Sequence, residues 1–137
     1  MGYGQSLEAA GATVLKFKEF GDYQGTWWAL VEYEGGKRWV NGSYGSCSGC
    51  DSFQAEFDYL NHDCLKETYY NPIWSGFIDG CETCESTKQK LIAFGKQYLD
   101  NYWFSQEEAE NHMVKRMEGW KDKEDEEILE FLKNNRI

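Results

Sequence analysis

The positions of apolar and polar residues in the first third of the chain predict three β-strands. The first runs from Ala12 to Phe20, where apolar and polar residues alternate; the second runs from Thr26 to Glu34 and the third from Arg38 to Tyr44. Short turns separate them, including a Glu-Gly-Gly-Lys turn at 34–37 that is typical of a hairpin. The pattern therefore predicts a three-stranded antiparallel meander.

The same alternation predicts which side of each strand faces a core. In the first strand Thr13, Leu15 and Phe17 fall on one face, opposite Lys16 and Lys18. In the second strand one face is apolar throughout and carries Trp27, Ala29, Val31 and Tyr33. The other face is apolar only at its start and carries Trp28, Leu30, Glu32 and Glu34. A sheet of this size needs helices to cover it, and the second half of the chain can supply them.

Three segments of the second half carry apolar residues at helical spacing: 85–103, 105 to about 120, and a last segment after Asp122. Ser105 and Glu108 have the spacing of a capping box, and Asp122 can cap the last helix, whose first turns are acidic. We expect the buried side of the middle helix to consist of Met113, Val114, Met117 and Trp120.

Two shorter helices and one irregular segment complete the pattern. Ser6 can cap a helix over 7–10 that Gly11 ends, and Asp51 or Ser52 can cap a helix running to about residue 60. Residues 61–80 are rich in aromatic side chains and show no clean period, so we expect a long ordered loop there.

Strands followed by helices predict an α+β fold: a three-stranded antiparallel meander followed by a helical second half packed on it. The length of 137 residues is that of one domain, spanning 1–137. A 17% aromatic content and a single proline, Pro72, favour a well-packed core over disorder.

The formal net charge of −10 changes the range of partners to expect. A strongly acidic surface repels nucleic acid and anionic membranes, so direct binding to either is disfavoured. A protein partner with a basic surface, such as a nucleic-acid groove, is favoured. Acidity that merely keeps the protein in solution is the simpler interpretation. There is no apolar run of ~20 residues and no secretory signal, so we expect a cytoplasmic protein with reduced cysteines.

Four of the five cysteines form two C-x-x-C pairs, Cys47 with Cys50 and Cys81 with Cys84. Two such pairs can close a tetrahedral thiolate site, which predicts a structural zinc ion that staples the fold. His62 and Cys64 lie between the pairs and are reserve ligands. A closed four-thiolate site has no open position for water and implies no catalysis.

Three other interpretations of the cysteines and of the aromatic segment stay open. The cysteines can be reduced and packed as small hydrophobic residues. Cys47 and Cys50 can form a redox pair before a predicted helix, although three antiparallel strands are not the usual context of that motif. The aromatic residues of 69–77 can line a pocket for a small ligand. The sequence contains no phosphate-binding loop and no nucleophilic triad, so we expect no enzymatic activity.

Acidic side chains on the last two predicted helices are the candidates for partner binding, because carboxylates can replace phosphates in a basic groove. The candidates are Glu107, Glu108, Glu110, Glu124, Asp125, Glu126 and Glu127. The alternative is that these residues only solvate their helices.

Two segments, DYQGTWW at 22–28 and GSYGSCSGCDSF at 42–53, resemble small acidic proteins of tailed phages and prophages, and the likeness extends through FGKQYL at 94–99. The resemblance carries over no functional residues. It implies a setting, the cytoplasm of an infected bacterium, where small acidic phage proteins often block host enzymes or defence systems. We therefore expect an anti-defence, anti-CRISPR-like interaction protein that inhibits a host nucleic-acid-handling or defence protein.

Overall fold

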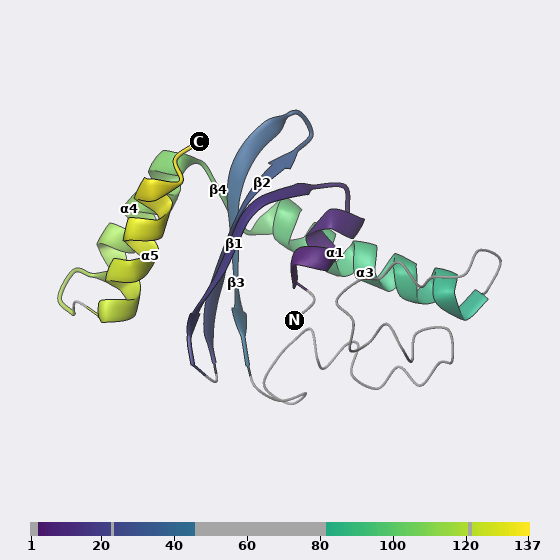
Figure 1. Cartoon of the computed structure of the whole chain (residues 1–137), viewed down its shortest axis with the longest axis horizontal. Helices are drawn as coiled ribbons and strands as arrows, with labels where there is room; N and C mark the ends of the chain where they lie inside the picture. Colours follow the sequence, from purple (N-terminus) through teal and green to yellow (C-terminus); the bar gives the residue numbers. More distant parts are fainter. Residues whose placement is uncertain (1–2, 23, 46–81, 121) are drawn as a thin grey trace.

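The computed structural model of the chain describes residues 3–22, 24–45, 82–120 and 122–137, with side chains from residue 88 onward in the third range (Figure 1). The elements follow the α+β order expected from the sequence. They are α1 (Tyr3–Ala9), β1 (Thr13–Gly21), β2 (Gly25–Tyr33), β3 (Gly36–Tyr44), α3 (Glu82–Asn101), β4 (Trp103–Phe104), α4 (Gln106–Arg116) and α5 (Lys123–Asn134). The helix predicted after Asp51 and the loop predicted over 61–80 lie outside the described residues.

The described strands form one antiparallel sheet in the order β1-β2-β3-β4, which confirms the predicted meander and adds a fourth strand. β4 pairs with β3 through Trp39 opposite Phe104 and Val40 opposite Trp103. The sequence pattern placed Trp103 at the end of a helix. That prediction was wrong, because a two-residue strand is too short to show an alternation of its own.

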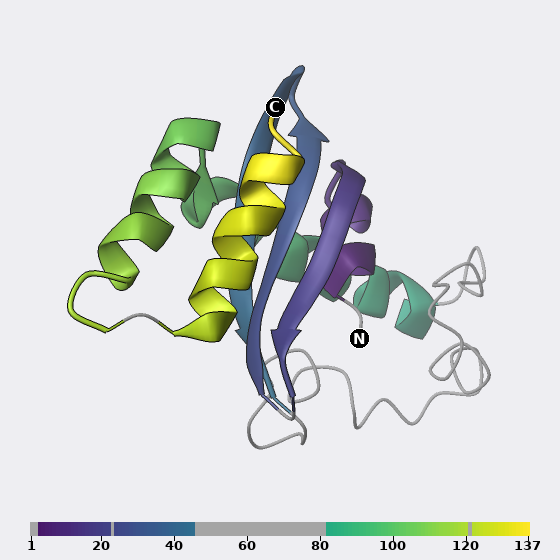
Figure 2. The same ribbon diagram turned by 60° about the vertical axis from the view of Figure 1, so that its left-hand side comes forward.

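Helices cover both faces of the sheet (Figures 1 and 2). α1 and α3 supply the helical side of one buried cluster, whereas α4 and α5 supply the helical side of another. The helical second half therefore splits between the two faces, and the N-terminal helix joins α3. The alternating faces of β2 explain this arrangement, since Trp27 belongs to the first cluster and Trp28 to the second.

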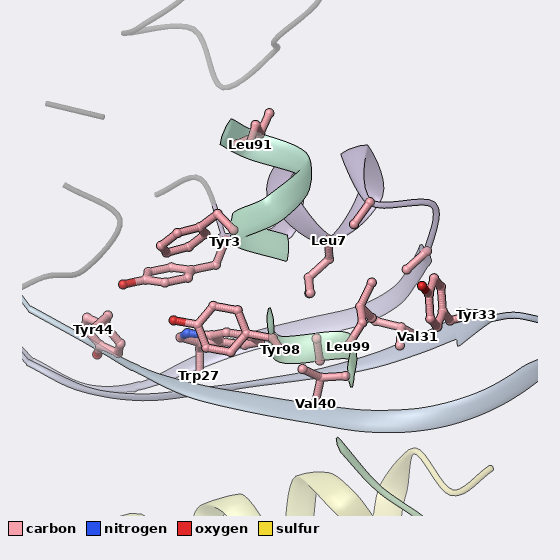
Figure 3. Packing of buried hydrophobic residues seen from close by; sticks show 14 residues of the cluster. Tyr3, Leu7, Trp27, Val31, Tyr33, Val40, Tyr44, Leu91, Tyr98 and Leu99 are labelled. Carbon is pink, nitrogen blue, oxygen red and sulfur yellow. The ribbon is translucent and has the colours of Figure 1, made fainter. Parts of the chain in front are cut away.

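Trp27 lies at the centre of the first cluster and is fully buried (Figure 3). Its ring centroid is 5.2 Å from that of Tyr3, 5.1 Å from that of Tyr98 and 5.5 Å from that of Phe17. These rings come from α1, α3 and β1, so one tryptophan of β2 joins three other elements. Aromatic pairs at such spacings add stabilisation beyond the area that they bury.

α1 and α3 approach each other closely at Gly95, where a Cβ would overlap the carbonyl oxygen of Ser6 and lie 3.1 Å from the Cβ of Ala10. The expectation that Ser6 caps a helix was wrong, because α1 begins at Tyr3 and Ser6 is buried inside it. Its hydroxyl donates a hydrogen bond of 2.7 Å to the carbonyl of Tyr3. Gly11 follows α1 with a φ of +105°, which agrees with its predicted role as the residue that ends the helix.

The second cluster packs α4 and α5 against the opposite face of the sheet. Its strand residues include Phe20, Trp28 and Trp39, and Met113 and Leu132 are fully buried against them. The pairing of the two tryptophans is edge-to-face, with ring centroids 6.4 Å apart. This cluster fixes the position of the two acidic helices on the sheet.

A β-bulge corrects the predicted face of β1. Val14 pairs with Val31 and Lys16 with Leu30, so Leu15 is an extra residue in the ladder. As a result Val14 and Phe17, rather than Leu15 and Phe17, pack against the first cluster, and Leu15 is 38% exposed. A bulge shifts the alternation of side chains by one residue, and the sequence pattern alone does not reveal it.

The capping box at Ser105 is present, and Asp122 is the N-cap of α5, as predicted. The predicted extent and buried side of α4 were partly wrong. The helix ends at Arg116, and of the expected apolar stripe only Met113 is fully buried. Val114 is 46% exposed and Trp120 is 79% exposed. No helix in the described part of the chain combines the length and the apolar character that crossing a membrane requires.

Candidate functional site

The seven acidic residues predicted from the sequence to bind a partner, called the nominated carboxylates below, lie on the α4–α5 hairpin, which comprises residues 105–137 (Figure 2). The two helices run in opposite directions, and ion pairs join them at both ends: Arg116 with Asp125 near the connecting turn, and Arg136 with Glu110 near the C-terminus. The first turn of α4 and the first turn of α5 therefore lie at opposite ends of the hairpin. The structure does not gather the nominated carboxylates into one cluster.

Two of the nominated carboxylates hold the hairpin together. Asp125 is only 7% exposed, and its Oδ1 lies 3.4 Å from the Nε of Arg116. Glu110 accepts hydrogen bonds from Gln106 at 2.9 Å and from Arg136 at 3.1 Å, and these bonds lower the pKa of the Glu110 carboxyl. Sequence spacing could not reveal these roles, because Arg136 is 26 residues from Glu110.

Four of the nominated carboxylates face solvent: Glu107 and Glu108 on α4, and Glu126 and Glu127 on α5. The Glu108 side chain also accepts the backbone N–H of Ser105 at 3.2 Å as part of the capping box. These four residues offer negative charge at both ends of the hairpin.

Glu124, the remaining nominated residue, is half-buried at the end of the sheet. Burial raises the pKa of its carboxyl, and the neighbouring Asp122 and Asp125 raise it further. Together with Asp22 and Glu127, Glu124 lines a hollow of about 350 Å³, to which Lys123 also contributes. The positive charge of Lys123 partly offsets the negative charge around this hollow.

A second hollow of about 340 Å³, the α5 hollow, is lined by Met117, Glu126, Leu129, Glu130, Lys133 and Asn134. Met117 and Leu129 are half-buried and form an apolar floor, whereas the four polar residues are exposed and form the rim. Glu130 was not among the nominated residues. It lies four residues after Glu126, which is the spacing of neighbours on one helical face, and this signal was available in the sequence.

The proposed zinc ligands lie almost entirely outside the described residues. This holds for Cys47, Cys50 and Cys81 and for the reserve ligands His62 and Cys64. Cys84 falls within α3, but its side chain is not among those described. Within the described residues no group of three or more His, Cys, Asp or Glu side chains is arranged to hold a metal ion. The zinc site and the aromatic pocket over 69–77 both stay predictions.

His112 is half-buried on α4. Its ring centroid is 5.1 Å from that of Phe104 and 6.1 Å from that of Trp28. Burial lowers the pKa of the imidazole, Arg116 lowers it further, and Asp125 partly opposes both effects. The neutral ring is therefore favoured, and it contributes to packing at the edge of the second cluster.

No protein-family model matches the chain, and no curated protein or solved structure is significantly similar to it. A function is therefore inferred from the chemistry of these surfaces.

Proposed function

We propose that this protein is a non-catalytic interaction protein whose α4–α5 hairpin binds a basic surface of a bacterial host protein that handles nucleic acid or acts in defence, and thereby inhibits it. One observation carries the proposal. The apolar sides of α4 and α5 are buried against the sheet, while Glu107, Glu108, Glu126 and Glu127 face solvent. The resemblance to small acidic phage proteins supports the cytoplasm of an infected bacterium as the setting.

The hairpin suits an extended basic groove better than a single basic pocket. An α-helix rises about 1.5 Å per residue, so the 11 residues of α4 separate the two acidic ends by about 15 Å. The segment 105–137 carries ten acidic and six basic side chains, so its surface is mixed rather than uniformly negative. A partner is therefore recognised by where the carboxylates lie, as well as by net charge.

We further propose that Cys47, Cys50, Cys81 and Cys84 hold a structural zinc ion. Four thiolates satisfy the tetrahedral preference of zinc and leave no position for substrate. The ion would tie the chain after β3 to the start of α3.

Affinity capture from a bacterial lysate tests the proposed function. The bait is the full chain, and the hairpin variant replaces Glu107, Glu108, Glu126 and Glu127 by Gln. The matched control makes the same change at four exposed glutamates elsewhere, Glu8, Glu19, Glu32 and Glu34. Glutamine preserves side-chain size and can replace Glu108 in the capping box.

We expect the wild-type chain and the matched control to capture the same nucleic-acid-handling or defence protein, identified by mass spectrometry. The hairpin variant should lose it, and capture should weaken as salt is raised, because exposed charges are screened. Equal loss in both variants would show that only net charge matters. Capture that changes neither with salt concentration nor with the hairpin substitutions would overturn the proposal.

A further inference from the structure

The α5 hollow has the chemistry of a receptor for one particular kind of side chain. This inference rests on the proposed function and names the group that the hairpin recognises: we propose that the α5 hollow binds an arginine side chain of the basic partner. Its floor is apolar and its rim carries two carboxylates, and an arginine likewise combines an apolar stem with a charged planar head.

The two rim carboxylates are spaced for a guanidinium group. Glu126 and Glu130 are four residues apart on α5, so their side chains are neighbours on the helix surface, about 5–6 Å apart at Cβ. A guanidinium presents five N–H donors in a planar fork and can donate to both carboxylates at once. A lysine ammonium is a compact charge that lacks this geometry.

The floor of the hollow favours the stem of the same side chain. Met117 and Leu129 are half-buried, and methionine adapts its shape to irregular surfaces. The methylene groups of an arginine would cover them while the head stays at the rim. An uncharged apolar side chain would instead remove water from two carboxylates without replacing its hydrogen bonds, which is unfavourable.

The hairpin's own arginines are engaged at other positions. Arg116 pairs with Asp125, and Arg136 pairs with Glu110. Among the described residues that line the hollow, Lys133 carries a positive charge, and this charge reduces the attraction for a second cation. Replacing Lys133 should therefore strengthen binding, and this expectation is specific to the proposed site.

The test is an NMR titration of the full chain, labelled at its methionine methyl groups, with hexa-arginine and hexa-lysine peptides as probes. Of the three methionines, Met117 lines the hollow, whereas Met113 lies on α4 and is buried in the second cluster, which provides an internal control. We expect hexa-arginine to shift the Met117 signal in a saturable manner and to leave Met113 unchanged. Hexa-lysine should bind more weakly.

Three variants locate the effect. Glu126→Gln combined with Glu130→Gln should weaken hexa-arginine binding about tenfold, since each exposed ion pair contributes modestly. The matched pair, Glu107→Gln with Glu127→Gln, has the same charge change outside the hollow and should weaken binding only about twofold. Lys133→Gln should strengthen it about twofold.

The inference is overturned if the two double variants weaken binding equally, if hexa-lysine matches hexa-arginine, or if the Met117 signal does not respond. In those cases a partner captured through the hairpin would still support the proposed function. If hexa-arginine does not bind and no basic partner is captured, the inference and the proposed function fail together.

Discussion

The indole N–H of Trp39 donates a 2.7 Å hydrogen bond to the Oε1 of Gln106, and this bond joins the buried centre of β3 to the first residue of α4. The same oxygen accepts the backbone N–H of Ile137 at 3.2 Å. The Gln106 amide nitrogen donates to Glu110 at 2.9 Å and to the carbonyl of Leu132 at 3.0 Å. One side chain therefore links the sheet, both acidic helices and the C-terminus.

Replacing Gln106 by Met, which has a similar length, should destabilise the fold by about 1–3 kcal/mol, because the buried Trp39 N–H loses its acceptor. Urea denaturation measures the change. Asn111→Ala, at an exposed position of the same helix, serves as control and should stay within about 0.5 kcal/mol of wild type. If both variants unfold at the same urea concentration, Gln106 does not have the role described.

The close approach of α1 and α3 predicts that Gly95→Ala is destabilising. Alanine improves helix propensity by up to about 1 kcal/mol, but its Cβ overlaps the Ser6 carbonyl and forces backbone to move. Overpacking of this kind costs about 1–3 kcal/mol, so we expect a net loss in thermal stability. Lys96→Ala, at the exposed neighbouring position, should change stability little. A stabilised Gly95→Ala variant would contradict the helix contact.

His112 should make stability depend on pH. Its folded-state pKa is lowered from the ordinary 6.5, so the unfolded chain binds the proton more readily. The stabilisation that the neutral His112 ring contributes is complete above pH 6.5. It is lost as the pH falls through 6.5 toward the pKa of His112 in the folded state. Urea midpoints at about pH 7.5 and about pH 5.5 measure the loss.

The control for this pH dependence is His112→Gln, which does not titrate. Wild type should lose more stability than this variant between the two pH values. The pKa of Glu110 is lowered from 4.5, so this carboxyl titrates below the window. The pKa of Glu124 is raised from 4.5, so its contribution has the opposite sign to that of His112 and is common to both proteins. A parallel decline in both proteins would assign the dependence to other groups.

The two C-x-x-C pairs predict one zinc ion per purified chain, measured by elemental analysis. Chelation should release the ion, expose the thiols to titration and lower thermal stability, because metal binding and folding are coupled. Cys81→Ser should abolish stoichiometric zinc, whereas Cys64→Ser should retain it. Five freely reactive thiols in a stable, metal-free protein would contradict the staple.

The strands were predictable because their apolar positions belong to two buried faces. Trp27 and Trp28 are adjacent and fully buried on opposite sides, and the alternation along β2 showed both faces. The helix caps at Ser105 and Asp122 were equally local, since each is a side chain bonding to backbone two or three residues away. Local chemistry of this kind can be read without tertiary information.

The wrong predictions concern features of the fold that tertiary contacts determine. The bulge at Leu15 is defined by pairing with β2, and the strand at Trp103 exists because β3 offers an edge. The exposure of Trp120 follows from the end of α4 at Arg116, after which the chain no longer keeps a helical face toward the sheet. None of these features changes the local pattern of polar and apolar residues.

The candidate site was predictable as a region but not in its details. Acidic composition identified α4 and α5, yet Asp125 and Glu110 serve as internal ion-pair partners. Met117 lines the α5 hollow because the packing of the two helices brings this residue beside α5. Sequence charge therefore indicated the surface, and the structure assigned different roles to its carboxylates.

The proposed function requires that the α4–α5 hairpin occupy a groove of the partner that otherwise binds nucleic acid. Competition for the captured partner measures this, with the fluorescence anisotropy of a labelled DNA duplex as the signal. We expect the wild-type chain to displace the duplex, less effectively as salt rises, and the variant with Gln at 107, 108, 126 and 127 not to displace it. Simultaneous binding of the duplex and the wild-type chain to the partner, or equal displacement by the variant, would contradict it.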